Sequence, residues 1–230
     1  MNQPVVDVII PALNEGASVT KVIADINKTI VREIVVVDND STDDTASVAR
    51  LAGATVLTEK KRGYGAACLT GIRHIQSKAV APDIIVFLDS DYSDHPEEIP
   101  MVIEPIINGN HDLVIGSRAL GNREAGSLTP QQLIGNRIAV WLIRLLYGIR
   151  FTDLGPFRAI RWNRLLDLGM KDETYGWTVE MQIKAVRKKL RCTEVPVSYR
   201  RRIGVSKVSG TVRGTFLAGY KIITTIFKYA

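Results

Sequence analysis

Short apolar runs separated by stretches of helical periodicity are the feature that most limits how this chain can fold. The runs are VVDVIIP (5–11), EIVVVD (33–38), ATVLT (54–58), DIIVFLD (83–89) and DLVIGS (112–117), and helical spacing recurs near 16–30, 43–53, 65–78 and 97–107. Strands that alternate with helices indicate a mostly parallel central sheet with helices on both faces. We therefore predict an α/β fold whose ligands bind at the carboxyl ends of the strands.

Composition fits one large domain with a real core. No linker or charge block divides the 230 residues, and 46% of them are hydrophobic. The net charge of +6 favours an anionic partner, such as a nucleotide, a phospholipid surface or a nucleic acid. Nothing beyond this charge favours nucleic acid, so we predict no nucleic-acid binding. The sequence indicates no oligomeric state.

The remaining whole-chain features favour a cytosolic location. Cys68 and Cys192 lie far apart without the spacing of a metal site, which is typical of free thiols in a reducing compartment. The amino terminus shows no secretory signal, and no run reaches the roughly 18 apolar residues of a membrane span. We expect a cytoplasmic protein, with contact to the inner face of the membrane left open.

Two aspartates, Asp89 and Asp91, follow the apolar run at 84–88. Carboxylates that share a site raise each other's pKa and destabilise the folded state unless a cation lies between them. A divalent metal site is one interpretation, and a loop in which the two aspartates cap the following turn is the other.

Polar residues also follow the other predicted strands. Asn14 and Glu15 come after the first strand, Asp38 and Asp40 after the second, and the basic segment EKKRGYG (59–65) after the third. We expect STDDT (41–45) to cap the next helix, which leaves Asp38 for another role. The glycines of the basic segment open a helix whose amino terminus could accept an anion, although a solvated loop fits equally well.

Taken in order, the motifs form a pattern. PALNE, VVVDNDSTDDT, RGYGAA, LDSDYSDHPEEIP, GSR, DLGPFRA and RRRIGVSKVSG occur over residues 5–210. The chain resembles family 2 glycosyltransferases of the GT-A (nucleotide-diphospho-sugar transferase) fold, and within them the dolichyl and polyprenyl-phosphate mannose and glucose synthases. Seven motifs in order are specific, although each one alone is weak.

The resemblance implies a role for each matching residue. Base and ribose would lie against the first two strand ends, and the Asp-x-Asp motif would bind Mg²⁺ or Mn²⁺ on the diphosphate. The implied nucleotide-binding residues are Pro11, Leu13, Asn14, Glu15, Asp38, Asp40, Gly65, Asp89, Ser90 and Ser206. The implied metal ligands are Asp89 and Asp91, and the implied catalytic residues are Asp91, Arg118, Glu180, Arg202 and Lys207.

Physical chemistry gives this assignment an independent reason. Negative charge grows on the diphosphate as a sugar leaves its nucleotide, and a divalent cation with Arg or Lys stabilises that charge. Mg²⁺ needs only one or two carboxylates because phosphate oxygens complete its shell. Arg202, Ser206 and Lys207 resemble a mobile loop that would close on the diphosphate and exclude water.

Three departures from the family pattern concern the acceptor. Tyr92, Ser93 and Asp94 replace the usual middle of DADLQHPPE, Pro156 stands in LGPFRA where SGFRA is usual, and LTPQQLIGN (128–136) lacks the usual basic residues before Gly135. A helper for an acceptor phosphate is therefore missing from its expected place.

Two later segments have alternative interpretations. The helices predicted at 131–148 and 211–229 are either core or dimer helices or, for the second, an amphipathic helix in a membrane interface. We expect one catalytic domain over 1–210 followed by the amphipathic helix at 211–230. Glu180 would be the base for a hydroxyl acceptor, with Asp153 as a second candidate, whereas an anionic phosphate acceptor needs none.

The predicted function is metal-dependent, inverting transfer of a hexose from a nucleotide diphosphate sugar of the UDP-glucose or GDP-mannose type. The acceptor would be a polyprenyl phosphate or another lipid-linked molecule. The alternatives are transfer to a soluble phosphorylated acceptor and a catalytically silent nucleotide-sugar binding protein.

Overall fold

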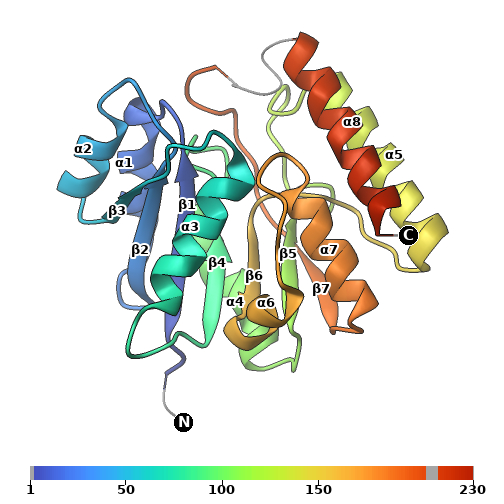
Figure 1. The fold of residues 1–230 in the computed structure, drawn as a ribbon, viewed down its shortest axis with the longest axis horizontal. Coiled ribbons are helices and arrows are strands. Elements are labelled where there is room, and N and C mark those ends of the chain that lie inside the picture. Colours follow the sequence, from blue (N-terminus) through green and yellow to red (C-terminus); the bar gives the residue numbers. More distant parts are fainter. Residues whose placement is uncertain (1–2, 206–211, 230) are drawn as a thin grey trace.

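A seven-stranded sheet forms the centre of the protein (Figure 1). The computed structural model describes residues 3–205 and 212–229, and of residues 212–216 only the backbone. The strands are β1 (Val6–Ala12), β2 (Val31–Asp38), β3 (Thr55–Thr58), β4 (Ile84–Phe87), β5 (Leu113–Ser117), β6 (Arg158–Arg161) and β7 (Cys192–Pro196). Their spatial order is β3-β2-β1-β4-β6-β5-β7, and β6 alone runs antiparallel to its neighbours. The order of the strands reverses between β1 and β4, which is where ligands bind in such sheets.

Helices cover both faces of this sheet. They are α1 (Gly16–Asp25), α2 (Thr45–Leu51), α3 (Tyr64–Gln76), a 3₁₀ turn η1 (Pro96–Glu98), α4 (Ile99–Ile107), α5 (Pro130–Tyr147), α6 (Trp162–Leu168), α7 (Trp177–Arg187) and α8 (Val212–Lys228). The buried residues of α1, α2 and α4 pack on one face, and those of α3, α6 and α7 pack on the other. Helices α5 and α8 lie side by side beyond the second layer (Figure 1).

Strict alternation in β1 and β2 explains why both faces need a cover. In β1, Val8 and Ile10 belong to the core under α1 and α4, whereas Ile9 between them belongs to the core under α3. Val36 and Val37 of β2 divide in the same way. Apolar side chains that point to both faces read as an unbroken apolar run, which is typical of strands buried between two helical layers.

The predicted fold class is confirmed, with additions in the second half of the chain. All five predicted strands are present, but β6, α6 and β7 were not predicted. The β6 segment RAIR contains only two apolar residues among four, so its sequence does not indicate a strand. Its fully buried Arg158 is accommodated because it donates hydrogen bonds to the backbone oxygens of Gly155 and Thr178. An arginine with several buried partners can occupy a core strand, although its sequence pattern resembles a loop.

Helix α5 is fixed at both ends by its sequence. Thr129 and Gln132 form a capping box, in which each side chain accepts a hydrogen bond from the other residue's backbone N–H, and Pro130 occupies the first turn. Gly148 ends the helix in the left-handed conformation, at φ 73°.

Helix α8 has one packed face and one exposed face. It contacts α5 and α7, and its residues Thr225 and Ile226 are buried. Tyr147 of α5 donates a hydrogen bond of 2.7 Å to the carbonyl oxygen of Ile226. The predicted amphipathic helix is therefore docked on α5 and α7, with Thr225 and Ile226 of its inner face in the core. Among the described residues, no helix is long and apolar enough to cross a membrane.

A buried carboxylate, Glu180 of α7, ties this helical layer together. Its oxygens accept hydrogen bonds from the backbone N–H groups of Lys171 and Asp172 and from the hydroxyl of Tyr229, and pair with Lys184 at 2.7 Å. Burial alone would raise the pKa of Glu180, but the bonds from Lys184, Tyr229 and the two amides outweigh it and lower the pKa. Glu180 thus joins α7, α8 and the segment before α7.

Replacing Glu180 with glutamine should destabilise the protein, because one buried charge of an ion pair is then left without its partner. We expect Glu180→Gln to lower the free energy of unfolding by about 3 kcal/mol at pH 7. A depressed carboxyl pKa stabilises the fold above the unfolded value of 4.5 and ceases to do so as pH falls through the folded value. The difference between wild type and variant should therefore shrink below about pH 4.5.

Urea unfolding at several pH values measures this difference. Glu104→Ala, on the exposed face of α4, is the control and should change stability by no more than about 0.5 kcal/mol. A Glu180→Gln variant as stable as wild type at pH 7 would contradict the assigned role.

Candidate active site

Strand ends bring three loops together above the point where the strand order reverses. The loops follow β1, β2 and β4, and they carry Leu13 to Glu15, Asn39 and Asp40, and Asp89 to Asp91. The Ser90 hydroxyl donates a 2.8 Å hydrogen bond to the carbonyl oxygen of Pro11, which joins the first and third of these loops. The convergence predicted from the order of strands is therefore present.

A first cavity of about 400 Å³ opens between these loops and the start of α3. Its lining includes seven of the predicted site residues, namely Pro11, Leu13, Glu15, Asp89, Ser90, Asp91 and Arg202. The other lining residues are Ala12, Asn39, Arg62, Gly63, Tyr64, Thr174 and Tyr175. Of these, Asn39 was not predicted as a site residue although it lies inside the motif DND, because the prediction rested on the two aspartates beside it.

Four predicted nucleotide-binding residues do not line the first cavity. The side chain of Asn14 accepts a hydrogen bond from the N–H of Thr42, and Asp38 accepts one from Ser41. Asp40 pairs with Arg62 at 3.3 Å. These three therefore shape the loops around the cavity. The side chain of Asn39 connects β2 to the basic loop. Its amide donates hydrogen bonds to the carbonyl oxygens of Glu59 and Lys61 and accepts one from the N–H of Gly63.

Gly65, the fourth, faces protein backbone. A Cβ there would lie 2.0 Å from the carbonyl oxygen of Asp172, and one on Gly63 would lie 2.1 Å from that of Glu173. The N–H groups of Gly65 and Ala66 donate to the carbonyl oxygens of Thr174 and Glu173. The start of α3 is thus bonded to the segment before α7, so these two N–H groups do not match the anion-binding interpretation, one of the two left open by the sequence.

The acidic loop after β4 buries three carboxylates. Asp91 and Asp94 are buried and Asp89 is nearly so. One oxygen of Asp91 accepts hydrogen bonds from the N–H and hydroxyl of Ser93, and one oxygen of Asp94 accepts the N–H of Asp89. The second oxygen of Asp94 is buried and has no hydrogen-bond partner among the described residues. The loop-cap interpretation holds for Asp91 in part, but these bonds leave most of the carboxylate charge uncompensated.

Burial and mutual repulsion raise the carboxyl pKa values in this loop. Burial, and then the charge of Asp91, raise the pKa of Asp89 to about 7, although Arg118 and Arg202 act in the opposite direction. The pKa of Asp94 is raised well above its usual range for the same reason. Within the described residues, no group of three or more His, Cys, Asp or Glu could hold a metal by itself. Two carboxylates would suffice for a hard cation that also binds phosphate oxygens.

Arg202 bridges the acidic loop and the first strand end. Its guanidinium lies 2.6 Å from an oxygen of Glu15 and 3.0 Å from an oxygen of Asp91. The backbone beside it is fixed, because the N–H of Ile203 donates to the carbonyl oxygen of Asp91 at 2.9 Å. Ser206 and Lys207, predicted for the same loop, lie outside the described residues.

A second cavity of about 340 Å³ lies on the other side of the acidic loop. It shares Asp89, Asp91 and Arg202 with the first cavity. The rest of its lining is Arg118, Ala119, Arg123, Leu128, Gln131, Gln132, Leu133, Gly135, Asn136, Asp153, Leu154, Thr178, Tyr199, Ala218, Gly219 and Ile222. Helices α5 and α8 therefore form its outer wall, which the sequence did not indicate.

Arg118 is held rigidly at the floor of the second cavity. Two of its guanidinium nitrogens bond to the two oxygens of Asp153, each at 2.7 Å, and its backbone N–H bonds to the same carboxylate. The guanidinium also lies 5.0 Å from the centre of the Tyr199 ring. Burial opposes the charge of Asp153, but the guanidinium of Arg118 outweighs it and lowers the carboxyl pKa. Asp153 is therefore an anchor for Arg118 and a poor base.

Glu180 lines neither cavity, which corrects its assignment as a base. All of its described partners belong to the helical layer, and its lowered pKa makes it a weak proton acceptor. Glu180 was predicted near the site because it lies in the first turn of a helix, now α7. Its side chain instead points into the protein interior.

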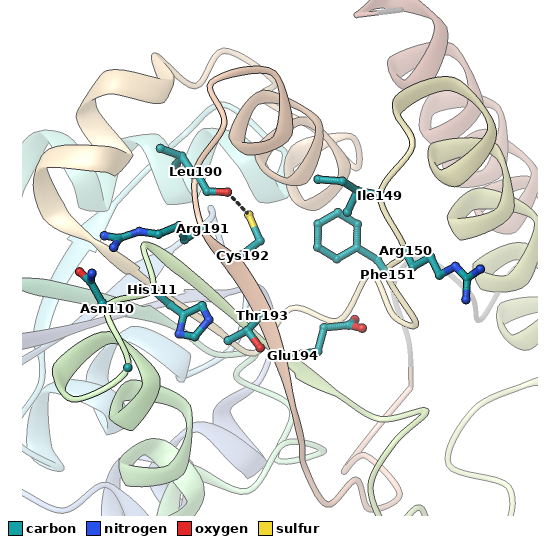
Figure 2. A pocket seen from close by; sticks show the side chains of 11 residues that line it. Asn110, His111, Ile149, Arg150, Phe151, Leu190, Arg191, Cys192, Thr193 and Glu194 are labelled. Atoms are coloured by element: carbon teal, nitrogen blue, oxygen red, sulfur yellow. Dashed lines mark hydrogen bonds between the residues drawn. The ribbon is translucent and has the colours of Figure 1, made fainter.

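A third cavity, of about 670 Å³, lies at the opposite end of the sheet (Figure 2). It is lined by residues that precede β5 and begin β7, among them His111, Arg191 and Cys192. The Cys192 thiol points toward the carbonyl oxygen of Leu190, and burial raises its pKa to about 12. A protonated thiol at the amino ends of strands is not a nucleophile, so we assign the active site to the first two cavities.

Comparison with known proteins identifies the family. The family model described as Glycosyl transferase family 2 matches residues 7–168. An uncharacterized glycosyltransferase of Mycobacterium tuberculosis is 36% identical over 215 residues, which are 93% of this chain and 94% of the relative. The undecaprenyl-phosphate mannosyltransferase of Micrococcus luteus is 30% identical over 90% of this chain and 88% of its own.

A solved structure shows the same fold. It is glucosyl-3-phosphoglycerate synthase from Mycobacterium tuberculosis in complex with Mn²⁺, UDP-glucose and phosphoglyceric acid. The two structures match with a TM-score of 0.78 and 23% identity over 98% of this chain and 79% of the other. With the family model covering more than half of its residues, the chain belongs to glycosyl transferase family 2 and is a glycosyltransferase of the GT-A fold.

Proposed function

We propose that this enzyme transfers a hexose from a nucleoside diphosphate sugar in the first cavity to a phosphorylated acceptor in the second. The observation that carries the proposal is the partition between the cavities, which consists of Asp89, Asp91 and Arg202 and belongs to both. A diphosphate held at this partition would present the sugar to the second cavity. Two substrates held on either side of shared charged groups are what group transfer requires.

The residues of the partition fit a divalent cation. Asp89 and Asp91 supply hard oxygen ligands, and a cation beside them would favour the charged form of Asp89, whose pKa burial and the charge of Asp91 raise. They would hold Mn²⁺ or Mg²⁺, which would neutralise charge on the departing diphosphate. The complex of glucosyl-3-phosphoglycerate synthase with Mn²⁺ and UDP-glucose supports both the metal and a uridine donor.

Arg202 would act on the leaving group. In the protein without donor its guanidinium is paired with Glu15 and Asp91. A diphosphate that arrives with its cation satisfies Asp91 and offers Arg202 anionic oxygens, so Arg202 would exchange a carboxylate for phosphate. Its contribution should grow as the sugar leaves, because negative charge then accumulates on the diphosphate.

For the acceptor, we favour a soluble phosphorylated molecule over the lipid-linked acceptor predicted first. The second cavity has a volume suited to a small acid, and three arginine and three amide side chains are among its nineteen lining residues. The phosphoglyceric acid bound by the solved relative supports this class of acceptor.

Transfer to a polyprenyl phosphate is the second candidate, because the wall of the second cavity has an apolar outer face. The exposed large apolar side chains of α5 and α8 are Ile134, Ile138, Trp141, Leu145, Leu146, Leu217, Tyr220, Ile223 and Phe227. Neither helix contains an acidic residue, whereas both contain Lys or Arg. An apolar face with basic residues fits an anionic bilayer. The Micrococcus luteus mannosyltransferase supports this candidate.

Product analysis tests both candidates. The purified protein is incubated with Mn²⁺, UDP-glucose or GDP-mannose, and either 3-phosphoglycerate or a polyprenyl phosphate in detergent, and products are identified by mass spectrometry. A glycosylated 3-phosphoglycerate is the expected product. Transfer to the lipid alone would support the second candidate, and the absence of transfer to either would contradict a phosphorylated acceptor.

Asp89→Asn and Asp91→Asn should each reduce sugar transfer at least about a hundredfold, since a metal ligand is lost and metal stabilisation of the leaving group is worth several kcal/mol. Both variants should fold, because the change relieves repulsion between buried carboxylates. Steady-state rates and circular dichroism measure the two effects. Asp167→Asn, an exposed aspartate on α6, is the control. Full activity of wild type in excess chelator would disprove the metal requirement.

Arg202→Ala should lower kcat more than it raises the KM for the donor, because its contact strengthens as the leaving group gains charge. Loss of a hydrogen-bonded charge corresponds to a decrease in kcat of about tenfold to a hundredfold. Arg50→Ala, on the exposed surface of α2, should leave both constants unchanged. A higher KM with unchanged kcat would show that Arg202 binds donor and transition state equally.

Substitutions on the outer face should separate membrane contact from folding. Deleting α8 would expose the core around Ile226, so we prefer Trp141→Ser with Phe227→Ser, at side chains that are 59% and 54% exposed. If the face binds membranes, wild type should sediment with vesicles containing phosphatidylglycerol, less so in high salt, since each basic residue contributes about 1 kcal/mol. The double variant should remain in the supernatant, and Leu51→Ser on α2 should behave as wild type. Background sedimentation of wild type would rule out this contact.

A further inference from the structure

The second cavity contains one arginine that no described carboxylate neutralises. Three arginines line it, and two of them form ion pairs. Arg118 pairs with Asp153, and Arg202 pairs with Asp91 and Glu15. Arg123 makes no ion pair with the described residues. Asp89, the remaining acid in the lining, would be occupied by the divalent cation of the proposed function. The cavity therefore has uncompensated positive charge at Arg123.

The backbone around Arg123 is held in place. The N–H of Tyr199 donates to the carbonyl oxygen of Asn122, and the N–H of Glu124 donates to that of Tyr199, each at 2.9 Å. These two bonds enclose Arg123, which pairs with Tyr199 as an isolated bridge. Because the Tyr199 ring also contacts Arg118, one residue positions both arginines.

The neighbouring helix start adds donors and positive potential. Gln131 and Gln132, in the first turn of α5, line the same cavity. The amino end of a helix of 18 residues favours a nearby anion through its dipole. The cavity thus presents a charged arginine, amide side chains and a helix amino terminus on the side away from the diphosphate.

We propose that Arg123 binds the phosphate group of the acceptor. A phosphate monoester carries a charge of about −1.5 to −2 at pH 7, and arginine binds such a group through two parallel N–H bonds. This inference rests on the proposed function and assigns its acceptor subsite. It also answers the departure in LTPQQLIGN: the basic residue missing before Gly135 is supplied by the preceding loop.

Arg123→Ala should raise the KM for the acceptor by at least about tenfold, because a charge-assisted bond to phosphate is lost. The KM for the donor and the rate of donor hydrolysis without acceptor should not change, since Arg123 does not line the first cavity. Arg123→Lys should recover part of the loss. The matched control is Arg50→Ala. Parallel assays with 3-phosphoglycerate and a polyprenyl phosphate show whether a soluble or a lipid molecule supplies the phosphate.

Binding of inorganic phosphate provides a readout that does not need turnover. By calorimetry, wild type saturated with UDP and Mn²⁺ should bind phosphate, and Arg123→Ala should bind it at least about tenfold more weakly. If neither acceptor is glycosylated but phosphate binding depends on Arg123, the inference stands and the proposed acceptors are wrong. If transfer occurs but Arg123→Ala changes neither the acceptor KM nor phosphate binding, the inference is overturned and the proposed function stands.

Discussion

Burial of like charges after β4 is the constraint on which the rest of the site depends. Asp89, Asp91 and Asp94 lie within six residues, and their partial or full burial limits how far water can compensate their charge. A buried charge without a partner costs several kcal/mol, so the fold must bring cations to this point. Arg118, which follows β5 directly, and Arg202, in the segment after β7, bring guanidinium groups to this point. Each also pairs with a carboxylate on a separate loop, Arg118 with Asp153 and Arg202 with Glu15. The acidic loop thus organises charges from the whole upper edge of the sheet.

The segment that carries Arg202 is fastened to the acidic loop itself. The backbone N–H of Arg200 donates to the carbonyl oxygen of Ser93, and its guanidinium bonds to the carbonyl of Tyr92 and lies 3.6 Å from the centre of that ring. Tyr92, in turn, bonds to Asp25 of α1 through its hydroxyl. Because the backbone is hydrogen-bonded on both sides of Arg202, an exchange of partners at Arg202 needs movement of its side chain.

Local patterns in the sequence predicted the part of the site built from strand ends. An apolar run followed by a polar residue such as Asp89 or Glu15 indicates both a strand and the position where it ends. Because ligands bind at the carboxyl ends of such strands, these patterns predicted several residues that line the first cavity. The second cavity could not be predicted in this way, because its wall depends on how α5 and α8 pack. Glu180 also could not be placed correctly from its sequence. Helical periodicity predicts the helix that carries it, but the direction of its side chain depends on Lys184, on Tyr229 and on two backbone amides of another segment. Arg158 was missed as a strand residue because one of its partners, the carbonyl oxygen of Thr178, is also distant in the sequence.

The glycines of the two cavities differ in whether they can be replaced. At Gly63, which lines the first cavity, and at the neighbouring Gly65 a side chain would collide with the carbonyl oxygens of Glu173 and Asp172, so neither glycine can be replaced without moving backbone. Gly135 and Gly219, on the facing helices of the second cavity, have no described atom within 4 Å of a Cβ. New side chains there would reshape the second cavity, the proposed acceptor site, at little cost to folding. Single substitutions at these two positions would therefore vary the proposed acceptor site and leave the first cavity unchanged, which makes them suitable positions for a directed library.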